Sequence, residues 1–183
     1  MALPDILVTT FMELEPHQFK PSFISDDRMS IEQLHAIDVR YYRFMYSTVG
    51  DKWNWTDRLL LEDDQIRAIM QDPYMSMYVL YFEGAPAGYI ELAQRENAAT
   101  EIVYLGLREE FLGFGLGKHL LSFGVIQAVE DGAEKVIVST CNLDGPHAIE
   151  NYRKRGFKIY NITEQPMPDK ERVKLTARQR GIY

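Results

Sequence analysis

This chain of 183 residues has little cysteine and no long apolar run. Cys141 is its one cysteine, which excludes an intramolecular disulfide and a zinc site built from several thiolates. The four histidines share no ligand spacing, so we expect no metal cofactor. No apolar run approaches the roughly 18 residues of a membrane span, and residues 1–11 lack the pattern of a signal peptide. We therefore expect a cytoplasmic protein without a membrane partner.

Basic residues are scarce relative to acidic ones: 20 against 27, a formal net charge of -7. A negative surface repels phosphate backbones, so we expect no nucleic-acid partner. The same field favours a small cationic partner such as an amine. The chain length and a hydrophobic share of 46% predict one globular domain that buries a sizeable core.

A helix is predicted in the N-terminal part of the chain, ending at Gly50. Ser30, with Gln33 three residues later, has the form of a capping box. The apolar residues that follow recur at helical spacing, on one face of the predicted helix. These apolar residues are Leu34, Ile37, Tyr41 and Phe44. A loop over residues 51–57 and a second helix ending near Gln71 are expected next.

Three consecutive strands are predicted after the second helix, followed by helix, strand, helix and strand. Including the first strand of the chain, strands are expected over residues 7–14, 75–82, 88–93, 101–107, 136–139 and 157–162. Neither a Rossmann nor a P-loop domain has three adjacent strands in this order. The sequence therefore predicts an α/β fold of the mixed α+β kind.

A glycine-rich turn lies between the strand ending near Leu107 and the next helix. We call residues 112–117 the glycine-rich turn; they are Leu112, Gly113, Phe114, Gly115, Leu116 and Gly117. Glycine permits positive φ and a close approach of backbone to ligand. Amides of such a turn and a helix N-terminus attract an anion, and Lys118 adds a candidate donor. A simple strand-to-helix corner is the alternative interpretation of this turn alone.

A second motif, residues 148–157, follows the next predicted strand. Its sequence is Ala148-Ile149-Glu150-Asn151-Tyr152-Arg153-Lys154-Arg155-Gly156-Phe157. The glycine-rich turn and this motif resemble two motifs of the GNAT superfamily of N-acetyltransferases: Arg/Gln-x-x-Gly-x-Gly and Asn-x-x-Ala-x-x-x-Tyr-x-Lys-x-Gly-Phe. The resemblance implies a central, largely antiparallel sheet, splayed at an acyl-CoA site and flanked by helices on both faces.

The resemblance also implies a single domain over residues 1–183 and a division of labour within it. Residues 1–73 would form the acceptor side and residues 74–164 the acyl-CoA-binding core, while residues 165–183 stay unassigned. The function implied is direct transfer of an acetyl group from acetyl-CoA to a primary amine, in a small molecule or a peptide, within a ternary complex. A non-catalytic acyl-CoA-binding sensor or scaffold is the alternative, and a homodimer is left open.

The resemblance places the acetyl-CoA cosubstrate residue by residue. The pantetheine arm would pair with the backbone at Leu105 and Leu107, and the pyrophosphate would lie on amides from Gly113 to Lys118. Leu112 stands where the family has a basic residue, so one phosphate contact is absent or is supplied by the lysine. Asn142 stands further upstream than the asparagine of the second motif and is a candidate contact.

Candidate proton donors and acceptors are a tyrosine and two glutamates. The resemblance gives Tyr152 the role of the acid that protonates the leaving thiolate; core packing is the alternative. Glu91 and Glu101 are carboxylates in otherwise apolar strands, symmetric about Glu96. In a simple hairpin they would face each other, and their repulsion would raise the pKa of one, which suits a base. The alternative is a bulge that turns one toward solvent.

Aromatic residues of the N-terminal half are candidates for the acceptor wall. Trp53, Trp55 and Tyr42 would line a site for a cationic or aromatic amine, and aromatic core packing is the alternative. Asp144 is interpreted as the cap of the helix that follows it.

Overall fold

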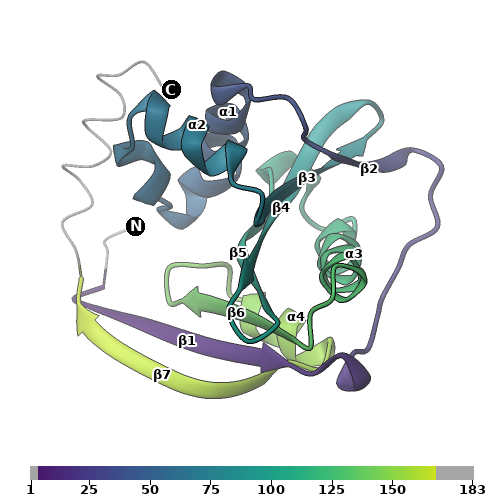
Figure 1. Ribbon diagram of the computed structural model, residues 1–183. Helices are drawn as coiled ribbons and strands as arrows, with labels where there is room; N and C mark the ends of the chain where they lie inside the picture. The colour runs from purple at the N-terminus through teal and green to yellow at the C-terminus, as the bar shows by residue number, and fades with distance from the viewer. Residues whose placement is uncertain (1–3, 168–183) are drawn as a thin grey trace.

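The computed structural model describes residues 4–167, which form a seven-stranded sheet in the order β2-β3-β4-β5-β6-β1-β7 (Figure 1). Neighbouring strands are antiparallel except β5 and β6, which are parallel. The strands are β1 (Ile6–Leu14), β2 (Met29–Gln33), β3 (Met75–Phe82), β4 (Ala85–Arg95), β5 (Ala99–Leu107), β6 (Lys135–Cys141) and β7 (Lys158–Pro166). The predicted mixed, largely antiparallel sheet is confirmed. Most of the unassigned segment 165–183 lies outside the described residues.

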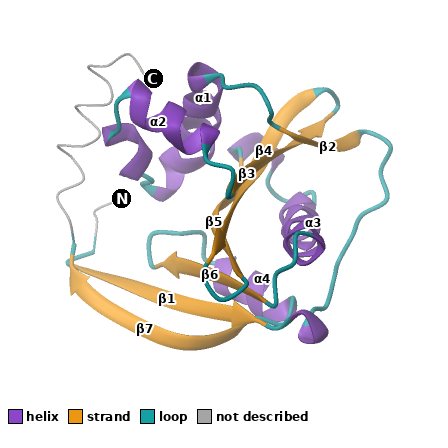
Figure 2. Ribbon diagram, viewed as in Figure 1, coloured by secondary structure: helices purple, strands orange, loops and turns teal. Residues whose placement is uncertain are grey.

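Helices cover both faces of the sheet, as predicted (Figure 2). The helices are α1 (Val39–Gly50), α2 (Asp63–Gln71), α3 (Leu116–Glu130) and α4 (Ala148–Lys154). One core lies between α1, α2 and strands β3 and β4, and a larger one lies between α3, α4 and the opposite face. No helix within residues 4–167 is long and apolar enough to cross a membrane.

The capping box predicted at Ser30 is wrong, because this residue lies in β2, opposite Tyr81 of β3. Ile31 packs against the larger core while Ser30 is exposed, so this segment alternates with the period of a strand. The edge of β3 offers it a pairing partner that helical spacing cannot reveal. Leu34 and Ile37 therefore precede the helix instead of opening it.

The two N-terminal helices begin at caps that the sequence analysis did not identify. The side chain of Asp38 accepts a hydrogen bond from the backbone N–H of Tyr41 (2.9 Å) and starts α1. Glu62 and Gln65 form the capping box of α2. A short 3-10 turn, Asp57–Leu60, lies between these helices. The predicted ends of the helices, at Gly50 and Gln71, are confirmed.

Helix α3 packs closely against the sheet because Gly124 faces it. A Cβ atom at this position would overlap Cδ1 of Ile90, a side chain with no exposed surface. Gly117, two turns earlier on the same helix, has room, since a Cβ there would lie 3.7 Å from Cδ1 of Leu107. Close packing at Gly124 thus fixes the position of the helix whose N-terminus carries the glycine-rich turn.

Gly124→Ala should lower the free energy of unfolding by about 1–3 kcal/mol, because overpacking outweighs the gain in helix propensity. Gly117→Ala is the matched control and should be neutral or stabilising by up to about 1 kcal/mol. Denaturant unfolding measures both. Equal stability of the two variants would show that α3 can move away from Ile90 at no cost.

Candidate functional site

A gap opens in the middle of the sheet where β5 parts from β6 (Figure 2). The two strands pair only over Ala99–Ile102 and Lys135–Val138. The next residue, Val103, is the extra residue of a bulge against β4, and a bulge bends its strand. From Val103 to Gly106 every residue is partly exposed although β5 is the fourth of seven strands. The stretch of β5 that borders the gap is therefore partly exposed.

The glycine-rich turn lies at the end of β5 that borders this gap. Gly113 and Gly115 have φ of +89° and +77°, the left-handed region that glycine favours. A Cβ at Gly113 would meet nothing within 4 Å, so a ligand can approach the backbone. Leu112 and Phe114 are exposed at 39% and 58% and place apolar, uncharged side chains beside it.

The N-terminus of α3 supplies positive potential to the turn. The helix has 15 residues with Gly115 as its N-cap and no acidic side chain in its first turn, so its partial positive charge is not neutralised there. Lys118 lies in that first turn, with its Nζ 3.8 Å from the position of a Cβ on Gly115. The turn, the lysine and the adjoining gap fit a diphosphate followed by an extended arm.

Tyr152 lies in α4, packed in the larger core. Its side chain is 7% exposed and its ring meets that of Phe157 edge-on, with centroids 5.6 Å apart. Burial, and to a smaller extent the carboxylate of Asp144, raise the pKa of Tyr152 above its ordinary value. The hydroxyl thus keeps its proton at any physiological pH and can act as a hydrogen-bond donor.

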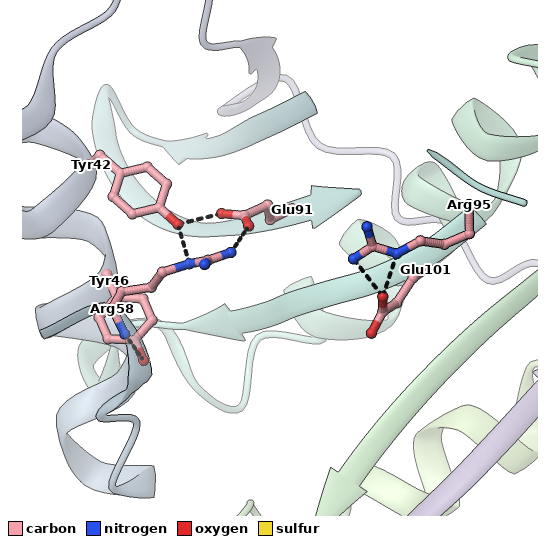
Figure 3. Close-up of polar contacts among 6 residues, drawn as sticks. All are labelled: Tyr42, Tyr46, Arg58, Glu91, Arg95 and Glu101. Carbon is pink, nitrogen blue, oxygen red and sulfur yellow. Dashed lines mark hydrogen bonds and ion pairs between the residues drawn. The ribbon is translucent and has the colours of Figure 1, made fainter. Parts of the chain in front are cut away.

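The prediction that Glu91 and Glu101 face each other is wrong (Figure 3). The bulge shifts the register, so Glu91 pairs with Tyr104 and Glu101 pairs with Ala93. Each carboxylate instead contacts its own arginine: Glu91 bonds to Arg58 and Glu101 to Arg95. The expected mutual repulsion is therefore absent between them.

Glu91 belongs to a buried network that ties the N-terminal helices to the sheet. Its side chain is 2% exposed, accepts a hydrogen bond from Tyr42 Oη (2.6 Å) and forms an ion pair with Arg58 (2.9 Å). Nε of the arginine donates to Tyr42 Oη (3.1 Å), and its backbone N–H donates to Tyr46 Oη (3.3 Å). Tyr42 is itself 2% exposed, so the structure assigns it to this network instead of the acceptor wall.

Glu101 is the more accessible of the two glutamates. Its side chain is 29% exposed, and Arg95 contacts its Oε2 at 2.7 Å. Glu101 of β5 pairs with Ile137 of β6, one residue before the last pair between the two strands. Its carboxylate is therefore partly accessible to solvent, in the last part of β5 that still pairs with β6.

Both tryptophans of the loop after α1 lie close to residues that border the gap. Trp55 packs against Tyr104 of β5, with ring centroids 5.0 Å apart, and its Nε1 donates to Asp144 Oδ1 (3.4 Å). Trp53 lies beside Gly145, where a Cβ would be 3.3 Å from its Cη2. Both indoles are partly exposed, and so remain available to a ligand.

Two predictions for the loop after β6 need correction. Asp144 does not cap α4, whose N-cap is His147; its Oδ2 accepts from Thr140 Oγ1 (2.7 Å) and Cys141 N (2.9 Å). The side chain of Asn142 accepts from Val8 N and donates to Ile6 O, both in β1. Asn142 therefore extends the sheet, and we do not assign it to the cosubstrate.

Sequence reasoning missed Arg58 and Asp144 as members of the site. A lone arginine in a loop and an aspartate before a helix each have common structural explanations. The signal available was the isolated Glu91 within an apolar strand, since a buried carboxylate requires a cationic partner. Within residues 4–167, no cluster of His, Cys, Asp and Glu side chains is arranged to hold a metal ion.

Comparison with known proteins identifies the class to which this fold and site belong. The model of the acetyltransferase (GNAT) family matches residues 31–157, and the chain therefore belongs to this family. A mycothiol acetyltransferase of Corynebacterium aurimucosum is 39% identical over 67 residues, which cover 37% of this chain and 22% of that protein. The chain thus spans about a fifth of the length of that curated relative.

Solved structures of the same fold extend the likeness to most of the chain. A GCN5-related N-acetyltransferase from Kribbella flavida has a TM-score of 0.64 and 16% identity over 88% of this chain and 58% of that one. An aminoglycoside acetyltransferase from an uncultured soil metagenomic sample has a TM-score of 0.60 and 17% identity over 71% of this chain and 88% of that one.

Glu91→Gln should lower the free energy of unfolding by about 3 kcal/mol, because it leaves the largely buried guanidinium of Arg58 without its counter-charge. Glu101→Gln, which breaks a half-exposed pair, is the matched control and should cost less than about 1 kcal/mol. The double variant Arg58→Met/Glu91→Leu should recover most of the lost stability. Denaturant unfolding that ranked the two single variants equally would contradict the buried network.

Proposed function

We propose that this protein is an N-acetyltransferase that moves the acetyl group of acetyl-CoA directly to a primary amine in a ternary complex. The observation that carries the proposal is the accessible gap between β5 and β6 beside the glycine-rich turn at the N-terminus of α3. The backbone of Leu105 and Leu107 would pair with the pantetheine arm along this gap. Amides from Gly113 to Lys118 would hold the pyrophosphate.

Glu101 is the proposed base, acting directly or through a water. The acceptor arrives as an ammonium ion, and the glutamate takes one of its protons so that the nitrogen carries a free electron pair. The new C–N bond forms as the C–S bond of the thioester breaks, and CoA leaves as a thiolate. Arg95 contacts the free carboxylate and must yield this position to the substrate ammonium.

Tyr152 is the proposed donor to the leaving sulfur. Because burial raises its pKa, complete proton transfer to a thiolate whose conjugate acid has a pKa of about 8.5 would be uphill in the unliganded protein. A hydrogen bond from the neutral hydroxyl stabilises the developing charge without that cost. We therefore interpret its role as stabilisation of the leaving thiolate by a hydrogen bond from the neutral hydroxyl.

A small cationic amine is the proposed acceptor class. The net charge of -7 favours it electrostatically, and the partly exposed indoles of Trp53 and Trp55 offer faces for a cation. One structural neighbour is an aminoglycoside acetyltransferase in complex with sisomicin, which supports an amine acceptor for this fold. A non-catalytic acyl-CoA-binding module stays the rival function, favoured by Leu112 in place of a basic residue.

CoA binding tests the glycine-rich turn. At 100 times its Kd, CoA should stabilise the native state by about 2.7 kcal/mol, a rise in melting temperature of roughly 5–10 °C. Gly115→Val should abolish this rise, because a β-branched residue is strained at positive φ and its side chain would occupy the space beside the amides. An undiminished rise in this variant, folded as judged by circular dichroism, would place CoA elsewhere.

Transfer assays with acetyl-CoA and a panel of amines separate the enzyme from the rival binding module. Glu101→Gln and Tyr152→Phe should each lower kcat by roughly 100-fold while leaving the Kd for CoA unchanged. Since the raised pKa of Tyr152 keeps its hydroxyl protonated up to at least about pH 10, the wild-type rate should not fall on the alkaline side below that pH through this residue. CoA binding without transfer to any amine would favour the rival.

A further inference from the structure

The loop after α1 crosses the gap between β5 and β6 on the side that faces α1. Trp55 contacts both borders of the gap: the ring of Tyr104 on β5, and Asp144, whose other oxygen is bonded to Thr140 and Cys141 of β6. A single indole thereby links two strands that have stopped pairing with each other. The gap is closed at this point by one side chain.

Glycines on two elements make room for this indole. A Cβ on Gly50, at the end of α1, would lie 2.6 Å from Cβ of Trp55, and one on Gly106 of β5 would lie 3.3 Å from its Cη2. The ring also meets those of Tyr46 (5.7 Å) and Tyr89 (6.3 Å). The indole therefore has a defined position between the helix and the strand.

The buried network described above anchors the same loop to the sheet. Three residues after Trp55, Arg58 forms its ion pair with Glu91 and donates a backbone hydrogen bond to Tyr46, which packs on the indole. The guanidinium also lies over the ring of Tyr104, 5.4 Å from its centroid. The tryptophan is thus held from both sides and cannot swing out of the gap without breaking buried contacts.

We propose that Trp55 forms the end wall of the acyl pocket, so that the protein selects acetyl-CoA over thioesters with longer acyl chains. The inference rests on the proposed function, because it requires the thioester to lie in the gap. Tyr104 and the position of a Cβ on Gly106 face the side of β5 on which the indole lies. The indole therefore lies in the path of an acyl group that extends through the gap toward an acceptor, and a longer acyl chain would have to displace it.

Binding of an acyl-CoA series measures this selectivity without catalysis. Calorimetric Kd values of CoA, acetyl-CoA, butyryl-CoA and hexanoyl-CoA are compared for wild type, Trp55→Ala and Trp53→Ala. Wild type should bind butyryl-CoA about tenfold or more weakly than acetyl-CoA, the usual scale for excess methylenes in a closed pocket. Trp55→Ala should bring this ratio to about one or reverse it, and leave the Kd for CoA unchanged.

Trp53→Ala is the matched control. It removes an indole from the same loop but leaves the contact between Trp55 and Tyr104 in place. Its ratio of butyryl-CoA to acetyl-CoA affinity should equal that of wild type. Trp55→Phe is used if the alanine variant does not fold. It keeps an aromatic ring in the core and should give a ratio between those of wild type and a variant without the indole.

Three outcomes overturn the inference: equal wild-type affinity for acetyl-CoA and hexanoyl-CoA, an unchanged ratio in both Trp55 variants, or an equal effect of the two alanine substitutions. In each of these, CoA still binds and the proposed function stands. Failure of the wild type to bind CoA at all would instead refute the proposed function, and the inference with it.

Discussion

The parting of β5 from β6 after four residue pairs is the constraint on which the rest of the structure depends. A parallel pair that continued would bury the backbone of both strands and leave no site in the sheet. The bulge at Val103 bends β5 away while β4 keeps its pairing with it. After this bend the chain runs from the end of β5 into the glycine-rich turn and then into α3. The gap and the N-terminus of α3 therefore lie next to each other.

An open gap in a sheet leaves backbone groups and side chains without neighbours, and the N-terminal half of the chain partly compensates. The ion pair of Arg58 and Glu91 holds the loop after α1 against β4, and the indole of Trp55 spans to Asp144. This arrangement uses a charge pair that gives little net stability on its own, because desolvation offsets its attraction. Its value lies in fixing where the loop lies, and therefore where the wall of the site lies.

The sequence predicted correctly those features that are determined by residues a few positions apart. The positive φ of Gly113 and Gly115, the helix that follows them and the helix end at Gly50 all follow from backbone preferences within a few positions. Residues that depend on a distant partner were not predictable in this way. Ser30 has the spacing of a cap, yet the free edge of β3 recruits it into a strand.

In the candidate site, too, features set by neighbouring residues could be predicted and features set by distant ones could not. The symmetry of Glu91 and Glu101 about their turn predicts a facing pair, but one extra residue at Val103 breaks it, and no local signal marks a bulge among apolar residues. Each carboxylate then finds an arginine, one of them from 33 positions away in the sequence. The family motifs could be recognised in the sequence because they depend on residues close together in the chain, such as the positive-φ glycines Gly113 and Gly115. The network of Arg58 and Glu91 joins side chains of separate elements, which no local motif marks.

Hydrogen–deuterium exchange with and without CoA tests the central claim most directly, because it reports on backbone amides individually. The account predicts slower exchange on CoA binding at two sets of amides, those of residues 103–107 in β5 and those of residues 113–118 at the start of α3. Strand β3, which is separated from β5 by β4, serves as the control, and exchange of its amides should not change. Protection confined to other segments, or at the turn without β5, would contradict a cosubstrate bound along the gap between β5 and β6.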